Sequence, residues 1–193
     1  MFTHRIDSAT YMKLLEPQDS DKLYQLIDSS REHLRQWLPW VDQNTTVEHS
    51  RQFIQHTLNQ FASNNGFTAG IWYQGALTGI IGFHKIDWSN RSTSLGYWLG
   101  EEYTGLGLMQ KAVSKSLDYA FLELRLNRVE IRSAIGNVRS RRIPEKLNFT
   151  HEGTIRQAEK LVYGYVNHNV YGMLLEEWEA KENSKTNDDE ANG

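Results

Sequence analysis

Cysteine is absent from the 193-residue sequence, which excludes disulfides, zinc–thiolate sites and cysteine nucleophiles. No apolar run is long enough to span a membrane, and the first residues lack the apolar segment of a signal peptide. We therefore expect a cytoplasmic protein that does not enter a membrane. The seven histidines are scattered and form neither a His-x-x-x-His nor a His-Glu-x-x-His pattern, so no metal is expected.

The composition is that of one ordinary globular domain. Hydrophobic residues make up 39% and charged residues 23% of the chain, and the formal net charge is −3. This net charge argues against a protein that binds nucleic acid mainly through the electrostatic field of the protein as a whole. We expect a single domain over residues 1–178, followed by a disordered polar tail at 179–193, which contains no large apolar residue.

Hydrophobic spacing predicts a helical first third and a strand-rich remainder. A first strand is expected at 11–15, then helices that begin near residue 19, near residue 34 and after Thr46, the last with Phe53 and Phe61 on its apolar face and its end at Gly66. Further strands are expected at 67–73, 77–83, 93–99, 129–135, 149–155 and 171–178, with helices at 106–124 and 140–146.

The order of these elements predicts an α+β fold. Consecutive strands separated by short turns form antiparallel hairpins, as expected at 67–83. The strand at 93–99, the long helix and the strand at 129–135 instead form a strand–helix–strand crossover, which makes the two strands parallel. The sheet should therefore be mostly antiparallel, with one parallel pair.

The most informative motif is Gly105-Leu-Gly107, because it lies between the expected strand 93–99 and the start of a long helix. Such a junction directs free backbone N–H groups and the positive end of the helix dipole at one point, where an anion such as a phosphate can bind. A glycine pair can also serve only as a turn. A Walker-type loop is excluded, because the chain continues Leu-Met-Gln instead of Gly-Lys-Ser/Thr.

Two cofactor interpretations remain for this loop. A dinucleotide site needs a third small residue where Gln110 stands, and it needs parallel strands from the start, with Glu130 as the candidate ribose ligand. The preceding hairpins argue against that sheet. The other interpretation is a pocket for acyl-coenzyme A.

A set of motifs in fixed order supports the second interpretation. Through these motifs the chain resembles the GNAT superfamily of N-acetyltransferases. Within that superfamily it is similar to the RimJ/RimL branch, which acetylates the N-termini of ribosomal proteins. The resemblance extends from about residue 10 to residue 178. The motifs that carry it are Trp37-Leu-Pro-Trp40, Leu95-Gly-Tyr-Trp-Leu99, Gly105-Leu-Gly107, Leu126-Asn-Arg-Val-Glu-Ile-Arg132, Asn137-Val-Arg-Ser140, Pro144-Glu-Lys-Leu-Asn-Phe149 and Glu152-Gly153 followed by Arg156.

Three positions depart from the family pattern. Glu102 stands where the phosphate loop often begins with Arg or Gln, and Leu106 replaces a common Lys between the glycines. Asn148 replaces the usual Gly before Phe149, although asparagine also adopts left-handed dihedral angles. The backbone N–H groups expected to bind phosphate are unaffected by these changes.

The resemblance implies where acetyl-CoA would bind. The two parallel strands diverge in the family, and the pantetheine arm lies between them like a substitute strand. Here this implies contacts with the main chain near Trp98 and Leu99, and with Asn137, which is otherwise a turn residue. The pyrophosphate would lie on the amides of Gly105, Leu106, Gly107, Leu108 and Met109. The cluster Arg139, Arg141 and Arg142, with Arg142 as the preferred candidate, would meet the 3′-phosphate or simply begin a helix in solvent.

The resemblance also implies catalytic and acceptor-site residues. Glu159 would be the general base, although a solvated loop carboxylate is the plain alternative. Ser140 would protonate the leaving thiolate, and it could equally be the N-cap of its helix. Trp37 and Trp40 would wall the acceptor site or simply belong to the core. His84 and His168 lie near strand ends and could face the pocket, but core or surface roles are preferred.

The chemistry favours an α-amine as acceptor. The terminal amine has a pKa near ~8, against ~10.4 for lysine, so deprotonation at pH 7 costs about 1.4 kcal/mol for the former and about 4.6 kcal/mol for the latter. We expect direct attack on acetyl-CoA by a protein N-terminus, and the resemblance is compatible with a homodimer. A polyamine or amino-sugar acceptor, or a non-catalytic acyl-CoA-binding module, remains the alternative.

Overall fold

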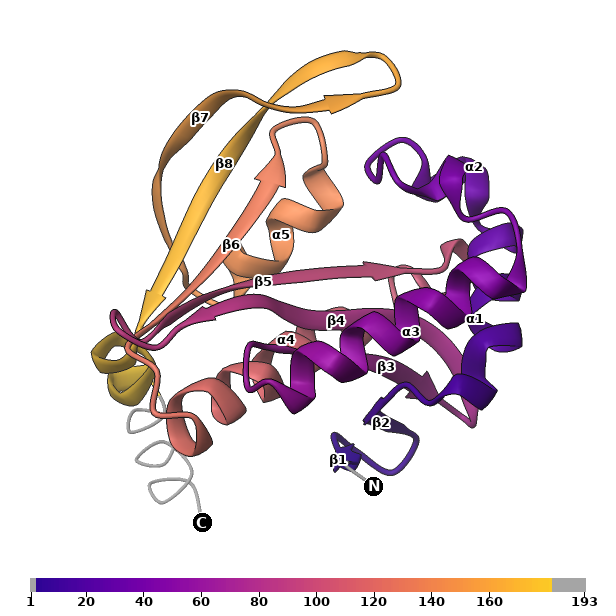
Figure 1. Ribbon diagram of the computed structural model, residues 1–193. Helices are drawn as coiled ribbons and strands as arrows, with labels where there is room; N and C mark the ends of the chain where they lie inside the picture. The colour runs from indigo at the N-terminus through magenta and orange to yellow at the C-terminus, as the bar shows by residue number, and fades with distance from the viewer. Residues whose placement is uncertain (1–2, 182–193) are drawn as a thin grey trace.

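A computed structural model describes residues 3–181, which form one eight-stranded sheet flanked by helices (Figure 1). Within residues 3–181 the strand order is β1-β2-β3-β4-β5-β6-β8-β7, and only β5 and β6 are parallel neighbours. The strands are β1 (Thr3–Arg5), β2 (Thr10–Leu14), β3 (Phe67–Tyr73), β4 (Ala76–Asp87), β5 (Ser92–Leu99), β6 (Arg128–Ala134), β7 (Thr150–Leu161) and β8 (Gly164–Leu174). The expected α+β class with a single parallel pair is confirmed.

Helices cover both faces of the sheet. Their bounds are α1 (Ser20–Ser29), α2 (Arg31–Leu34), α3 (Val47–Ala62), α4 (Leu108–Asp118) and α5 (Val138–Lys146). In Figure 1, α1 and α3 lie on the near face of the sheet, and α4 lies on the far face. No helix within residues 3–181 is both long enough and apolar enough to cross a membrane.

The sheet lies between two separate hydrophobic cores, and the central strand β4 contributes side chains to both. Ile80 belongs to the core with α1 and α3, whereas its neighbour Ile81 belongs to the core with α4. Successive side chains of a strand point to opposite faces, so a strand covered on both sides is apolar at consecutive positions. The run Leu77–Phe83 is buried throughout for this reason.

Two expected elements end differently in the structure. The helix expected at 106–124 begins at Leu108, and its last turn, Tyr119–Glu123, is a π-helix. In this turn Ala120 and Phe121 are buried, which continues the buried face of α4. The strand expected at 171–178 is the second half of β8, which ends at Leu174; residues 175–181 are helical, and Trp178 packs on Phe121 at 5.5 Å between ring centroids.

The segment expected as a loop around residue 159 belongs to a long hairpin of β7 and β8. Register shifts between His151 and Gly153 and between Ile155 and Glu159 interrupt the alternation of β7, so its period could not be read from the sequence. The helical residues 179–181 overlap the start of the expected polar tail. Residues 182–193 lie outside the described part of the chain.

Helix caps were partly predicted. Thr46 caps α3 as expected, since its hydroxyl accepts a hydrogen bond from the amide of His49 at 3.3 Å. Ser140 is not a cap; the N-cap of α5 is Asn137, whose side chain accepts from the amide of Ser140 at 3.1 Å.

Asn148 adopts the left-handed conformation expected of it, with φ of 59°. It precedes the buried Phe149, whose amide donates to the carbonyl of Pro144 at 3.0 Å and closes the end of α5. A β-branched residue at this φ is strained, so Asn148→Val should lower the free energy of unfolding by about 1–3 kcal/mol. Asn148→Gly should not lower it. Chemical denaturation of the two variants tests this; equal stabilities would contradict it.

Candidate active site

The parallel strands β5 and β6 diverge after three residue pairs. They pair only at Ser92 with Arg128, Thr93 with Val129 and Ser94 with Glu130. Beyond that point, β4 pairs with the outer edge of residues 95–99 and β8 with the outer edge of residues 131–134. The inner edges therefore face each other across a slot, with backbone donors and acceptors that no strand in the described chain satisfies.

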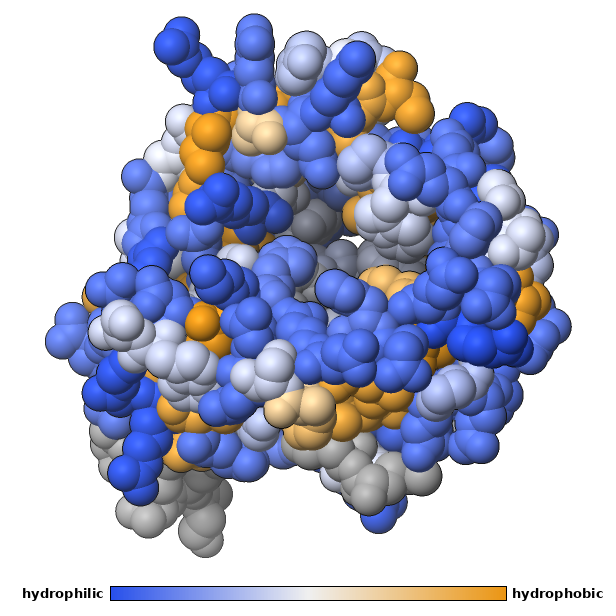
Figure 2. Space-filling model, viewed as in Figure 1, coloured by the Kyte–Doolittle hydropathy of each residue, from blue (hydrophilic) through white to orange (hydrophobic). Residues whose placement is uncertain are grey.

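A cavity of about 1430 Å³ occupies this slot and is lined by residues of α3 as well as by residues of α4 and α5. Figure 2 shows the surface hollowed at this place, below the β7–β8 hairpin. All the site residues expected from the sequence line the cavity except Leu106: they are Trp37, Trp40, Trp98, Leu99, Gly105, Gly107, Leu108, Met109, Asn137, Ser140, Arg142 and Glu159. The sequence prediction thus located the cavity, and the role of each residue stays a proposal.

The glycine loop presents main chain instead of side chains to the cavity. Gly105 and Gly107 have φ of 84° and 75°, which side-chain-bearing residues rarely adopt. Gly107 is the N-cap of α4 and provides no side-chain cap, and within residues 3–181 no protein acceptor binds the amides of Gly105 to Met109. The side chains of Leu108 and Met109 point into the core, 2% and 5% exposed. Leu106 is 52% exposed and lies outside the cavity lining, so only its amide can serve the loop.

A hydrogen bond joins β5 to α5 on the α4 side of the slot. The hydroxyl of Tyr97 donates to the carbonyl oxygen of Ser140 at 3.1 Å, and burial raises the pKa of Tyr97, which keeps it a donor. The main chain of Ser140 is therefore held at both its N–H, by Asn137, and its C=O. Ser140 lines the cavity, and within residues 3–181 its hydroxyl makes no hydrogen bond.

Of the three arginines of the cluster on α5, two line the cavity and one does not. Arg139 and Arg142 line the cavity together with Lys146. Arg141 does not line it; its guanidinium donates to the carbonyl of Ile135 at 3.0 Å and to the hydroxyl of Tyr171 at 3.3 Å. The cavity therefore has three cationic side chains from α5, on the side of the glycine loop.

Glu159 is fixed in a strand instead of lying in a solvated loop. It pairs with Val166 across the hairpin, and its Oε2 lies 3.2 Å from Nε2 of His168, an ion-pair distance without hydrogen-bond alignment. The Glu159 side chain is 35% exposed and that of His168 15%. Among the described residues that line the cavity, Glu159 is the only carboxylate.

Aromatic rings close the cavity opposite the strands. Trp37 meets Tyr163, at the tip of the β7–β8 hairpin, edge to face at 6.3 Å between centroids. Trp40 packs on Trp98 at 6.0 Å. Figure 1 shows the hairpin reaching toward the segment that follows α2. Both expected tryptophans thus line the cavity, and Trp40 also packs against the core of α1 and α3.

One face of α3 was missed by the sequence analysis. Phe53, His56 and Gln60 line the cavity, although Phe53 was expected in the core and is 39% exposed. The spacing of these residues, three and four apart, places them on one helix face, but nothing in the sequence indicates which strand that face meets. His84 and His168, expected in core or surface roles, line the cavity too. Within residues 3–181 no group of three His, Asp or Glu residues is arranged to hold a metal.

Comparisons with known proteins agree with this geometry. The family model of the acetyltransferase (GNAT) domain matches residues 11–150. "Putative ribosomal N-acetyltransferase YdaF" of Bacillus subtilis is 36% identical over 94% of this chain and 100% of its own length. The ribosomal-protein-serine acetyltransferase of Escherichia coli is 27% identical over 80% of this chain and 86% of its own.

Among solved structures, RimL, a ribosomal L7/L12 alpha-N-protein acetyltransferase in complex with coenzyme A, has the same fold. Its TM-score is 0.86 at 24% identity, over 91% of this chain and 99% of that one. The fold, the diverging parallel strands and the extent of the family match lead to one conclusion: the chain belongs to the GNAT acetyltransferase family.

Proposed function

We propose that the protein transfers the acetyl group of acetyl-CoA to the N-terminal α-amine of a protein by direct attack. The observation that carries the proposal is the slot between β5 and β6, whose unpaired strand edges lie beside the uncapped amides at the start of α4. An extended amide-containing arm fits between two such edges, and a diphosphate fits the helix N-terminus.

The residues around the slot suit the parts of acetyl-CoA. The main chain at Trp98 and Leu99 would pair with the pantetheine amides. The side-chain oxygen of Asn137 is already used by the amide of Ser140, so its NH₂ group is the part left to donate to the arm. Arg139, Arg142 and Lys146 would compensate the phosphate charges.

The proposed reaction needs no acyl-enzyme, in keeping with the absence of cysteine. Glu159 takes a proton from the acceptor ammonium, and the neutral amine attacks the thioester carbon. The new N–C bond forms as the C–S bond breaks, and the thiolate takes a proton from the hydroxyl of Ser140, which regains one from the amine nitrogen through solvent. The free hydroxyl of Ser140 and the cavity-facing carboxylate of Glu159 support these roles.

The charge of the cavity favours a peptide over a polyamine. Its described lining contains one carboxylate, Glu159, and four permanent cations: Arg132, Arg139, Arg142 and Lys146. A polyamine carries several positive charges and needs several carboxylates, but the described lining offers one; its cations are assigned above to the coenzyme phosphates or, for Arg132, are ion-paired with Glu130. An α-amine with a single positive charge needs only one. The names of the Bacillus and Escherichia relatives, both ribosomal-protein acetyltransferases, support the same acceptor class.

Thiol release from acetyl-CoA tests the proposal against a panel of N-terminal peptides, lysine, spermidine and amino sugars, with mass spectrometry of the products. We expect kcat/KM for the best N-terminal peptide to exceed that for spermidine by at least about 100-fold, the ratio that roughly 2.7 kcal/mol provides. Preferred turnover of spermidine would reverse the assignment of the acceptor. Binding of acetyl-CoA without turnover of any amine would indicate an acyl-CoA-binding module.

A further inference from the structure

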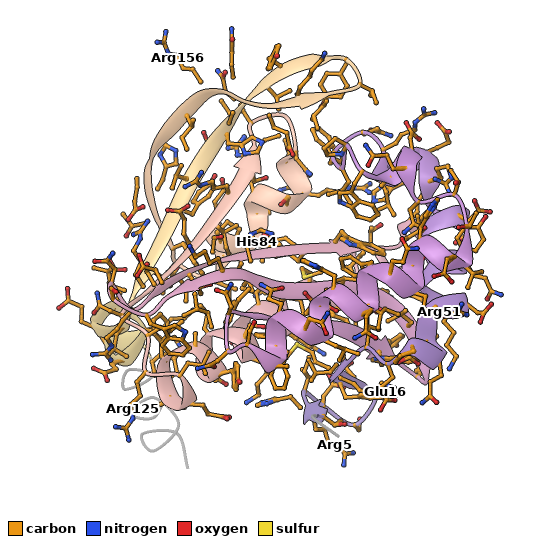
Figure 3. The ribbon with its side chains drawn as sticks, in the orientation of Figure 1. Arg5, Glu16, Arg51, His84, Arg125 and Arg156 are labelled. Carbon is orange, nitrogen blue, oxygen red and sulfur yellow. The ribbon has the colours of Figure 1, made fainter. Side chains whose placement is uncertain are left out.

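A bulge in β4 places His84 over β5, where it lines the cavity. The pairing of β4 with β5 shifts between Phe83 and Ile86, so His84 lies outside the regular register. Its ring covers the α-carbon of Gly96: a Cβ at that glycine would lie 2.4 Å from Nε2 of His84 and 2.6 Å from its Cε1. Gly96 belongs to the part of β5 that has diverged from β6. Figure 3 shows His84 beside β5, in the space between that strand and α5.

One ring nitrogen of His84 is held and the other is free. Nδ1 lies 3.1 Å from the hydroxyl of Ser94, the last residue of β5 that pairs with β6. Nε2, the atom nearest Gly96, has no hydrogen-bond partner in the described chain, and His84 lines the cavity. If Nδ1 carries the proton and donates it to Ser94, Nε2 presents a lone pair to the slot.

The surroundings of His84 favour its neutral form. Although the residue is exposed at the cavity mouth, packing around its ring lowers its pKa, and the guanidinium of Arg132 lowers it further. Besides His84, the histidine and charged side chains of the cavity lining are His33 on α2, His56 on α3, Arg132 on β6, Arg139, Arg142 and Lys146 on α5, Glu159 on β7 and His168 on β8. At neutral pH the imidazole is therefore an acceptor of hydrogen bonds and not a second cation.

We propose that His84 binds the acceptor amine: Nδ1–H donates to Ser94, and Nε2 accepts one N–H of the attacking nitrogen. This inference rests on the proposed function, and it adds a second contact to the amine besides Glu159. The two residues have different tasks. Glu159 removes the proton, whereas His84 orients the lone pair of the neutral amine toward the thioester and transfers no proton.

The proposal predicts a specific pattern of kinetic effects. His84→Phe should raise KM for the acceptor peptide about tenfold, the size of one hydrogen bond to a polar group, with affinity for acetyl-CoA unchanged. His84→Gln keeps an acceptor oxygen and should restore most of that loss. Because glutamine does not titrate, the variant should also lose the acid-side ionisation that His84 gives to the pH profile of kcat/KM for the acceptor.

Gly96→Ala provides a second, independent variant. The added Cβ must displace the imidazole, so the variant should reproduce the rise in acceptor KM while His84 itself is still present. Isothermal calorimetry of the acceptor peptide with the protein–CoA complex gives a readout that does not depend on turnover. Melting temperatures establish that each variant is folded.

The outcomes separate the inference from the proposed function. If the wild type acetylates peptides but His84→Phe changes neither acceptor KM nor peptide affinity, the inference is wrong and the proposed function stands. An acid limb that persists unchanged in His84→Gln also contradicts the inference. If the wild type acetylates no peptide, the proposed function fails first.

Discussion

Replacement of Glu159 by glutamine is expected to lower kcat about 10²–10⁴-fold while affinity for acetyl-CoA stays within about twofold, as for the loss of a general base. The structure gives three reasons for so large an effect. Glu159 is the only carboxylate among the described residues of the cavity lining. Its backbone is fixed by strand pairing with Val166, and its side chain is still 35% exposed. Glutamine retains the shape and cannot accept the proton.

The measurement is single-turnover thiol release with a saturating peptide, together with calorimetry of acetyl-CoA. Glu48→Gln is the matched control, because Glu48 lies on α3, makes an exposed ion pair with Arg51 at 2.7 Å and does not line the cavity. Its kcat should equal that of the wild type. A Glu159→Gln variant with wild-type kcat would show that the base is another group or a water chain.

The pH dependence of the activity of Glu159→Gln should distinguish the loss of a general base from the loss of the folded site. The α-amine of the peptide deprotonates in solution with a pKa near ~8. Above that pH, the neutral amine enters without help from the enzyme. The activity of Glu159→Gln relative to wild type should therefore rise between about pH 7 and about pH 9. A misfolded site would show no such recovery.

Prediction from the sequence was most accurate where the local residue pattern and the tertiary structure favour the same conformation. Gly105-Leu-Gly107 was expected to form a tight loop between a strand and a helix; the structure has this loop, with positive φ at both glycines, and its binding of an anion stays a proposal. The strand–helix–strand order around them predicted the parallel pair β5–β6 in the same way. Asn148 was expected in a left-handed conformation and is found at φ of 59°.

The errors arise where the backbone is irregular. The bulges in β7 hid the strand that holds Glu159. The bulge in β4 places His84 in the cavity, a position that the sequence left open but ranked below a core or surface role. The face of α3 that lines the cavity could not be predicted from the sequence, for a different reason. Helical spacing groups Phe53, His56 and Gln60 on one face, but the place where that face lies is set by contacts distant in sequence.

Blocking the glycine loop should have the other large effect, through binding instead of catalysis. Gly107→Trp should weaken acetyl-CoA binding by at least about 100-fold, equivalent to roughly 2.7 kcal/mol. No atom lies within 4 Å of where a Cβ would extend from Gly107, so the added indole enters the open space in front of the amides instead of the core. There it would occupy the position proposed for the diphosphate. Direct calorimetry of acetyl-CoA measures the loss.

The loss of stability that any side chain causes at positive φ must be distinguished from the blocking of the coenzyme site by the indole. Gly107 has φ of 75°, and placing tryptophan there costs about 1–3 kcal/mol of stability whatever it blocks. Gly75, in the turn between β3 and β4, has φ of 82° and equally open space, and it does not line the cavity. Gly75→Trp should therefore be destabilised by a similar amount and bind acetyl-CoA like the wild type. If both variants bind with wild-type affinity, the amides of Gly105 to Met109 do not hold the diphosphate, and the coenzyme approaches the slot between β5 and β6 by another route.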